Sequence, residues 1–438
     1  MIQSYKLSKL RKKTNIYPWW IYLFLFTVFF VAQPFDLLYS VHLADEEITS
    51  DMIFEAGIER NLSGNLTRRF ALFSLGAFAL VSLLRKTRNR IQINGHLGWL
   101  IIFFLAWAFI SLTWAGDGLF LAARRVVILG MLSLGALAIA KRFSLENLIV
   151  FAFISGVITL VLGFCCEAIL GTFQPFGYKY RFSGLMHPIY QAINCGMMSL
   201  SALVLARTTE RGRIFYLVAA FSGVFFILLT KSRGPTAFFI IAVVAYWSMV
   251  LSIYRKFTYT YIFLTAIILL FFAFGNNYEG ISKKLLLLGR QEKTIESTTT
   301  LTGRIPLWKE CLDYAAQRPF LGYGYDSFWT PYRSNKMFFV TGWAKNDTHN
   351  AFIDVLLGLG IPGVFAFTLI VLISIKRSFS FYKASNNNVW AFVYAILIMY
   401  LLNNLLLAQH LHPHIPTFII LTIFAKLGFC NFSTSEEL

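Results

Sequence analysis

Long apolar segments recur along most of the chain, and short gaps that carry charged residues separate them. A helix needs about 20 apolar residues to cross the hydrocarbon core of a bilayer, and it satisfies its own backbone hydrogen bonds there. We therefore predict an all-α integral membrane protein with about twelve transmembrane helices. The expected spans are residues 17–32, 70–84, 97–114, 119–140, 148–170, 189–206, 214–230, 235–252, 259–274, 351–375, 389–408 and 415–430.

One long polar segment, residues 275–349, interrupts this pattern and contains almost no apolar stretch of spanning length. It divides the chain into an N-terminal bundle of about nine helices (1–274), a large loop (275–349) and about three C-terminal helices (350–438). Within the loop we expect short helices, one of them over residues 304–318. Its apolar stripe is predicted from helical spacing to contain Trp308, Leu312 and Ala315 or Ala316.

Composition agrees with a membrane protein, because 57% of the residues are hydrophobic and only 14% are charged, against about 25% charged in soluble domains. The first span follows a basic stretch, Lys6 to Lys13, as in a secretion signal. No convincing small-residue cleavage site follows it, so we interpret it as a retained first helix.

Charge predicts the orientation. With the N-terminus in the cytoplasm, 20 of the 39 lysines and arginines and only four of the 21 acids fall on the cytoplasmic side. The positive-inside rule requires this bias, and it accounts for most of the net charge of +18. Both termini are then cytoplasmic and the 275–349 loop is outside. The basic residues form short clusters between spans, which argues against nucleic-acid binding.

Several cations on the outer side run against that bias. Lys231 and Arg233 occupy a short turn before Gly234 and Pro235, and Arg304 opens the expected loop helix. A turn arginine ordinarily marks a membrane boundary. Its planar fork also binds phosphate oxygens in a bidentate manner, and a helix N-terminus favours an anion near Arg304.

His349 lies directly before the apolar run 351–363. A histidine at a helix start is usually solvated or a cap, and Asp347, Thr348 and Asn350 make capping plausible here. Histidine is also the side chain most easily poised as a general base near pH 7. Asp354 is a candidate for orienting the ring, although a spacing of five residues matches one helix face poorly.

No metal site is predicted. His410, His412 and His414 alternate, but no carboxylate or cysteine lies beside them, so a solvated polar rim is favoured over metal binding. The five cysteines form no zinc spacing and indicate no disulfide framework.

Several short motifs accompany these candidates. The loop and the span after it contain Thr302–Gly303–Arg304, Trp308, Arg318–Gly324, His349–Phe352 and Gly358–Gly363, and the chain before the loop contains Arg181–Pro188 and Ser232–Arg233–Gly234. In order and spacing these motifs resemble the signature of the superfamily of O-antigen ligases and Wzy-type O-antigen and exopolysaccharide polymerases.

The resemblance implies a GT-C-like glycosyltransferase of the bacterial inner membrane with a periplasmic active site. Its donor would be a glycan on undecaprenyl diphosphate, and its product would have an inverted anomeric centre. Arg233 and Arg304 would hold the diphosphate, with Arg181 and Lys231 as further phosphate contacts, and His349 would act on the acceptor hydroxyl. His187, Asp354, Arg124 and Arg125 are accessory candidates. No cofactor or metal is implied.

The acceptor stays open at this stage. A polymerase extends a second lipid-linked glycan, a ligase uses lipid A–core, and a related subgroup glycosylates proteins. The run Gly322–Trp329, followed by Gly342–Trp343, favours the polymerases. A transporter or lipid flippase is the alternative from another class, and it would use Arg124, Arg125 and Glu167 as intramembrane charges. The chain shows no evident internal repeat of the transporter kind.

Overall fold

The structure is a computed structural model, and it describes residues 19–33, 35, 39–44, 66–85, 91–177, 180–210, 212–252, 304–341, 347–407 and 413–430. The predicted span 259–274, most of the 33–69 loop, residues 275–303 and 342–346 of the 275–349 loop, His410 and His412 lie outside these residues. In the described part every regular element is a helix, and the only extended pairing is a single bridge between Ile91 and Cys430.

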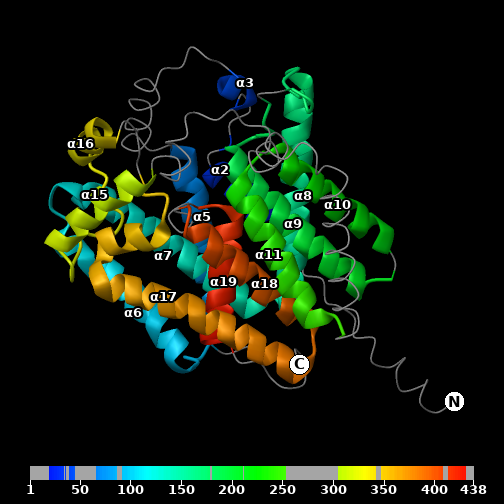
Figure 1. The fold of residues 1–438 in the computed structure, drawn as a ribbon. Coiled ribbons are helices and arrows are strands. Elements are labelled where there is room, and N and C mark those ends of the chain that lie inside the picture. Colours follow the sequence, from blue (N-terminus) through cyan, green and yellow to red (C-terminus); the bar gives the residue numbers. More distant parts are fainter. Residues whose placement is uncertain are drawn as a thin grey trace.

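The helices follow one another as shown in Figure 1. Their bounds are α2 (Trp19–Ala32), α3 (Tyr39–Ala44), α5 (Leu66–Leu84), α6 (Gly95–Ile110), η1 (Ser111–Trp114), η2 (Gly116–Gly118), α7 (Leu119–Arg142), α8 (Leu145–Ile169), α9 (Pro188–Thr208), α10 (Arg213–Leu229), α11 (Arg233–Val250), α15 (Arg304–Gln317), α16 (Pro331–Thr341), α17 (Ala351–Ser385), α18 (Asn388–Asn404) and α19 (Ile415–Phe429).

Seven of the described helices are long and apolar enough to cross a membrane, namely α5, α6, α7, α8, α9, α11 and α17. Four more, α2, α10, α18 and α19, are apolar but shorter. Each of these eleven overlaps one predicted span, and ten agree with it within a few residues, whereas α17 continues ten residues beyond the predicted end at 375. The all-α membrane class is therefore confirmed. The total of twelve spans, the GT-C relationship and the periplasmic position of the loop stay predictions.

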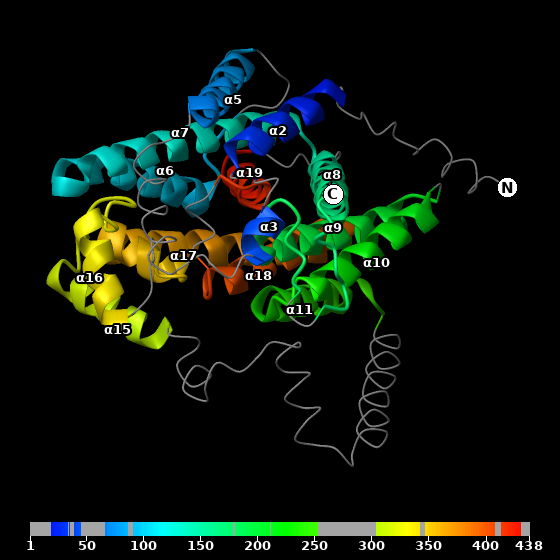
Figure 2. The same cartoon turned by 90° about the horizontal axis from the view of Figure 1, so that it is seen from above.

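The core of the bundle lies around α9, α18 and α19, whose residues are mostly buried, and α19 is drawn near the centre of Figure 2. Trp390 and Phe418 are among its largest fully buried side chains. By contrast, α5, α6, α7 and α11 bury less than a third of their most apolar windows. Their exposed apolar faces are those that a bilayer would cover.

The parallel helices α5 and α7 pack with glycines between them. The Gly76 backbone lies against the Met131 side chain, and the Gly135 backbone lies against Leu75. At their C-termini, Lys141 Nζ donates hydrogen bonds to the carbonyls of Leu83 (3.0 Å) and Arg85 (3.3 Å). From these contacts to their C-terminal ends, the two helices therefore run side by side in the same direction.

Basic side chains cap helix ends at one end of the bundle, which we call the capped end (residues 82–85, 91–94, 140–144 and 426–430). Lys426 is buried and donates hydrogen bonds to the carbonyls of Ala140 (3.3 Å) and Phe143 (2.7 Å). Arg377 donates in the same way to Leu427 (2.9 Å) and Asn94 (3.0 Å). The carbonyls of Ala140 and Leu427 lie in the last turns of α7 and α19, where no following helical amide donates to them, so the cations satisfy them.

The opposite end, which we call the loop end, carries α15, α16 and residues 171–187. Here α17 is broken at Gly360, whose φ of 65° and ψ of −167° are not helical. The turn 319–324 fills the break, because the amides of Tyr323 and Gly324 donate to the carbonyls of Leu357 (2.8 Å) and Gly358 (2.9 Å).

Two further features complete this turn. The Ile361 amide donates to the Pro319 carbonyl at 2.8 Å, on the other side of the break. Gly322 adopts a φ of 64°, and a Cβ there would lie 2.6 Å from the Leu357 carbonyl oxygen. Irregular backbone inside a membrane bundle is tolerated only where protein satisfies it, so the turn and the broken helix form one unit.

Candidate functional site

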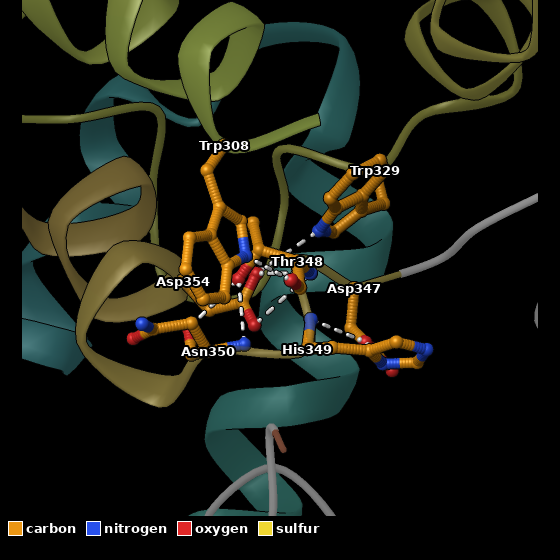
Figure 3. Close-up of polar contacts among 7 residues, drawn as sticks. All are labelled: Trp308, Trp329, Asp347, Thr348, His349, Asn350 and Asp354. Atoms are coloured by element: carbon orange, nitrogen blue, oxygen red, sulfur yellow. Dashed lines mark hydrogen bonds and ion pairs between the residues drawn. The ribbon is translucent and has the colours of Figure 1, made fainter. Parts of the chain in front are cut away.

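The backbone around His349 is fixed by hydrogen bonds from three directions (Figure 3). Asn350 caps α17 by accepting from the amides of Phe352 (3.0 Å) and Ile353 (3.3 Å). Trp308 Nε1 donates to the Thr348 carbonyl at 2.8 Å, which ties α15 to the same segment. The cap predicted at this position is thus made by Asn350 rather than by His349.

Asp354, put forward from the sequence for orienting the ring, instead holds the backbone that precedes it. Its buried carboxylate accepts from the Thr348 amide (3.1 and 3.3 Å) and from Trp329 Nε1 (3.3 Å). The carboxylate lies one turn into α17, where it reaches back over the helix start. Asp354 is therefore a positioning residue in this structure.

Asp347 is the carboxylate that faces the imidazole. Its Oδ1 contacts His349 Nδ1 and also accepts from the His349 amide at 2.8 Å. This tight turn places His349 at a φ of 54°, a conformation that few residues other than glycine adopt. A carboxylate on Nδ1 favours the tautomer that leaves Nε2 as the acceptor, and Figure 3 shows that nitrogen pointing away from Asp347.

Sequence reasoning missed this role for Asp347, although a local signal was present. An aspartate two residues before another residue often accepts the amide of that residue, and here the second residue is His349. The side chains of the pair are 24% and 18% exposed, so the ring is open to a substrate.

Arg304 begins α15 close to this pair. Burial lowers the pKa of its guanidinium, and the nearby charge of Asp347 acts in the opposite direction. Among the residues that the structure describes, none forms a hydrogen bond or an ion pair with Arg304.

The helix 304–318 is confirmed, and Ala315 lies on its buried face as predicted, but the prediction was wrong for Leu312. The buried residues are Leu307, Cys311 and Ala315, whereas Leu312 is exposed. They pack against Tyr323, Phe328, Trp329 and Leu357. The buried face is thus rotated by one residue, because α15 leans on the broken helix α17 and on the turn that follows α15.

The other predicted cations lie on the turn between α10 and α11 or contact it from the segment before α9. Arg181 donates from Nε to the Thr230 carbonyl (3.1 Å) and from Nη2 to Ser232 Oγ (3.3 Å). Lys231, at a φ of 49°, donates to the Gly177 carbonyl at 3.3 Å. Arg233 begins α11 and makes no hydrogen bond or ion pair with any described residue, and its Nε is buried.

Glu167, the acid proposed for transport, holds the segment that carries Arg181. Its carboxylate is fully buried and accepts from the Tyr180 hydroxyl (2.5 Å), from the Ser183 amide (2.9 Å) and hydroxyl (3.1 Å), and from the Gly184 amide (2.7 Å). Burial and the hydrogen bond to Glu167 raise the pKa of the Tyr180 hydroxyl. The four donors explain how a buried acid is stabilised here.

His187 caps the start of α9, where its Nδ1 accepts from the Ile189 amide at 3.2 Å. Its ring meets that of Tyr190, which in turn packs 4.4 Å from the ring of His414. His414 is buried, whereas His410 and His412 lie outside the described residues. Within the described chain, no three His, Cys, Asp or Glu side chains gather as a metal site would require.

Arg125 pairs with Asp326 at 2.9 Å and so joins α7 to the segment after α15. Burial raises the pKa of Asp326, and the Arg125 charge opposes this shift. Arg124 lies beside Arg125 on α7. Asp326 is a second residue to which the sequence analysis gave no role, and only the folded chain brings it next to a helix 200 residues earlier.

A protein-family model described as O-antigen ligase matches this region of the chain. Residues 217–368 match the O-antigen ligase family. The matched segment contains Arg233, Arg304 and His349, and the resemblance to the ligase and Wzy-type superfamily is therefore confirmed. No curated protein matches the chain.

The match to the O-antigen ligase family supports an activity of the ligase or polymerase type and a membrane location. The structure brings Arg304, Asp347 and His349 together in one group. Arg181, Lys231 and Arg233 form a second group at the same loop end, and no hydrogen bond or ion pair between described residues joins Arg233 to the first group.

Proposed function

We propose that the protein transfers a glycan from undecaprenyl diphosphate to an acceptor hydroxyl at the loop end, on the periplasmic face of the inner membrane. One observation carries the proposal. Arg233 and Arg304 make no hydrogen bond or ion pair with described residues, whereas Arg125 and Arg181 are held by protein groups. Two half-buried guanidinium groups without such partners suit the phosphate oxygens of a lipid diphosphate.

In this reaction His349 Nε2 accepts the proton of the acceptor hydroxyl while the hydroxyl oxygen forms a bond to the anomeric carbon. The bond from that carbon to the diphosphate oxygen breaks, and the electron pair leaves with the diphosphate. Arg233 and Arg304 stabilise the charge that develops on the leaving group. A single displacement inverts the anomeric centre. The diphosphate leaves readily as an anion, so the scheme requires no metal.

The lipid tail of the donor needs an apolar surface near these cations. A groove of about 360 Å³ between α8, α9 and α10 is lined by apolar side chains, among them Leu160, Phe164, Met198 and Phe226. Phe226 packs 4.6 Å from the ring of Phe182, the residue after Arg181. The groove thus approaches the α10–α11 turn from the membrane side, which supports its use by an isoprenoid chain.

Within this activity we favour repeat-unit polymerisation over ligation to lipid A–core. The reason is the aromatic run Gly322–Trp329, whose sequence resembles exopolysaccharide polymerases more closely than typical ligases. A transport function is less well supported, because Glu167 and Arg125 each hold a loop segment in place. Moving either charge during transport would release that segment.

The test is complementation of a strain that lacks the protein with Arg233→Ala, Arg304→Ala and His349→Ala, at matched protein levels. Arg333→Ala is the matched control. It also removes a guanidinium group, but this one is held by protein groups, since it covers the rings of Tyr323 and Phe328. Surface glycan and lipid-linked intermediates are compared on gels. We expect single repeats to accumulate without long chains. Long chains stranded on the lipid would indicate a ligase, and wild-type behaviour of all three variants would refute the proposed site.

A further inference from the structure

The C-terminal end of α18 lies between the two groups of candidate site residues. α18 packs against α11, which begins with Arg233, and against α17, which follows His349 in the chain (Figure 2). Both of these helices begin at the loop end, whereas α18 ends there, since Gly234 lies against the Leu406 side chain just after α18. The last turn of α18 therefore lies between Arg233 and the segment that carries His349.

Two asparagines occupy this last turn, and each keeps an amide oxygen without a hydrogen-bond partner. Asn403 Nδ2 donates to the Met399 carbonyl and Asn404 Nδ2 donates to the Tyr400 carbonyl, each at 2.8 Å. Because each amide nitrogen faces a carbonyl, the oxygen of each amide points elsewhere. Both side chains are buried, and no described residue donates a hydrogen bond to either oxygen.

Tyr325 faces the same end of α18 from the segment after α15. It is buried, and its hydroxyl makes no hydrogen bond with any described residue. Tyr400, one turn before Asn404, lies close enough to interact with Tyr325 electrostatically. The neighbour of Tyr325 in the chain, Asp326, is within the same range of Asp347. The Asn404 side of α18 is therefore directed toward the group around His349.

The bond to the preceding turn does not by itself explain the asparagines. Thr422 on α19 is equally buried and donates in the same way to the Phe418 carbonyl at 2.8 Å, and its hydroxyl needs no further partner. An asparagine makes this bond and adds a carbonyl oxygen, whose burial without a donor costs about 1–3 kcal/mol. Two such oxygens side by side indicate a partner outside the described part of the chain.

The chemistry of these oxygens defines that partner. An amide oxygen accepts from an O–H or N–H group, whereas the phosphates of a diphosphate diester carry no hydrogen to donate. Arg233 and Arg304 offer donors only. A molecule that satisfies both sets has an anionic group directly beside hydroxyl or amide groups. A sugar attached through its anomeric carbon to a diphosphate has this structure.

We propose that the end of α18 binds the first sugar of the donor, the one whose anomeric carbon carries the diphosphate. Asn403 and Asn404 accept hydrogen bonds from hydroxyl or acetamido N–H groups of this sugar, and the Tyr325 hydroxyl makes a further one. The assignment rests on the proposed function, because the diphosphate-binding arginines place the sugar. These contacts select the sugar and orient its anomeric carbon toward His349.

The experiment measures the affinity of the purified full-length protein in detergent for two lipids. One is the lipid-linked repeat unit extracted from a strain that lacks the protein, and the other is undecaprenyl diphosphate, which has no sugar. Wild type is compared with Asn403→Leu/Asn404→Leu, with Arg233→Gln/Arg304→Gln and with Thr422→Val. Thr422→Val is the matched control, because it also removes a buried side-chain bond to the carbonyl four residues earlier.

We expect wild type and control to bind the sugar-bearing lipid about tenfold or more tightly than the sugar-free lipid, as two neutral hydrogen bonds allow. The asparagine variant should lose this difference and bind the sugar-free lipid as wild type does. The arginine variant should bind both lipids more weakly.

Thermal unfolding without lipid verifies the fold of each variant. The asparagine variant should melt at or above the temperature of wild type, because leucine removes buried polar groups that lack a partner. If it melts lower, Asn403→Ser/Asn404→Ser takes its place. Serine keeps a hydroxyl for the same carbonyls but does not reach the sugar, so the same loss of preference is expected.

The other outcomes are distinct. An asparagine variant that keeps the preference for the sugar-bearing lipid would overturn the proposal and show that water or another part of the chain meets these oxygens. Equal weakening for both lipids would also overturn it, because that result indicates a structural role. Wild-type binding of both lipids by the arginine variant, with the preference lost in the asparagine variant, would refute the proposed diphosphate site and leave the sugar contacts standing. Absence of lipid-linked repeats from the strain would refute the proposed function and this assignment with it.

Discussion

Replacing Asp347 with asparagine tests the proposal that this carboxylate prepares the His349 ring to act as a general base. Asparagine keeps a carbonyl oxygen that can accept from the His349 amide, a bond of 2.8 Å in the structure, so the turn should survive. The change removes the negative charge of the carboxylate that faces His349 Nδ1. An asparagine amide would also donate to Nδ1 and so place the ring proton on Nε2, where the base is required.

The expected loss follows from what the imidazole contributes. General-base help is worth about 10²–10⁴ in rate, and a wrong histidine tautomer costs about 10⁴ where the pair is buried, as in the Ser-His-Asp triad. The Asp347–His349 pair is partly open to solvent, which weakens the coupling. We therefore expect the transfer rate to fall about 10²-fold, which corresponds to about 3 kcal/mol in the barrier.

The assay is the transfer rate with saturating lipid-linked donor and purified protein in detergent. Asp313→Asn, an exposed carboxylate on α15, is the matched control, and His349→Ala sets the floor. If Asp347 acts through the ring, adding Asp347→Asn to His349→Ala should cause no further loss. A single variant within about threefold of wild type, or a double variant well below His349→Ala, would refute this reasoning.

Three further predictions concern stability and packing. Gly360→Ala should lower the melting temperature in detergent and reduce activity, because a Cβ would lie 2.2 Å from the Phe320 carbonyl oxygen at a φ of 65°. Such strain costs about 1–3 kcal/mol, and an unchanged melting curve would contradict the break in α17. Lys426→Met should destabilise the protein by about 2–6 kcal/mol, because the carbonyls of Ala140 and Phe143 lose this donor and each loss costs about 1–3 kcal/mol. Chemical denaturation measures the change in unfolding free energy, with Lys376→Met as the exposed control. Cys311, whose thiol pKa is raised by burial, should resist N-ethylmaleimide in a variant lacking the other four cysteines until the protein is unfolded, and rapid labelling of the folded protein would show that α15 is not packed as described.

The helices were predictable because a bilayer imposes one simple requirement on each of them, an apolar stretch of sufficient length. Even the short helix that begins at Arg304 was found from its spacing. Its buried face was not, because Leu307 and Cys311 are selected by contact with α17 and the turn before it rather than by their own helix. Hydrophobic spacing identifies a helix more surely than it identifies the partner of that helix.

The arrangement of the candidate site was predictable only in part, for a related reason. Arg233, Arg304 and His349 were put forward from residue type and motif, and their roles stay predictions. Which arginines engage protein groups depends on pairs far apart in the chain, such as Arg125 and Asp326. Asp347 lies close in sequence to His349, and the turn between them could have been inferred from local chemistry alone.

The break in α17 has a consequence for how the protein is made. The carbonyls of Leu357 and Gly358 receive donors from Tyr323 and Gly324, so α17 cannot settle in lipid without that turn. The chain order helps, because the ribosome synthesises the turn about 35 residues before the break that it fills. The same dependence limits domain exchange: a chimera that takes the loop from one relative and α17 from another would leave polar backbone exposed in the membrane. Residues 304–362 should therefore stay together in evolution and be exchanged together in engineered chimeras.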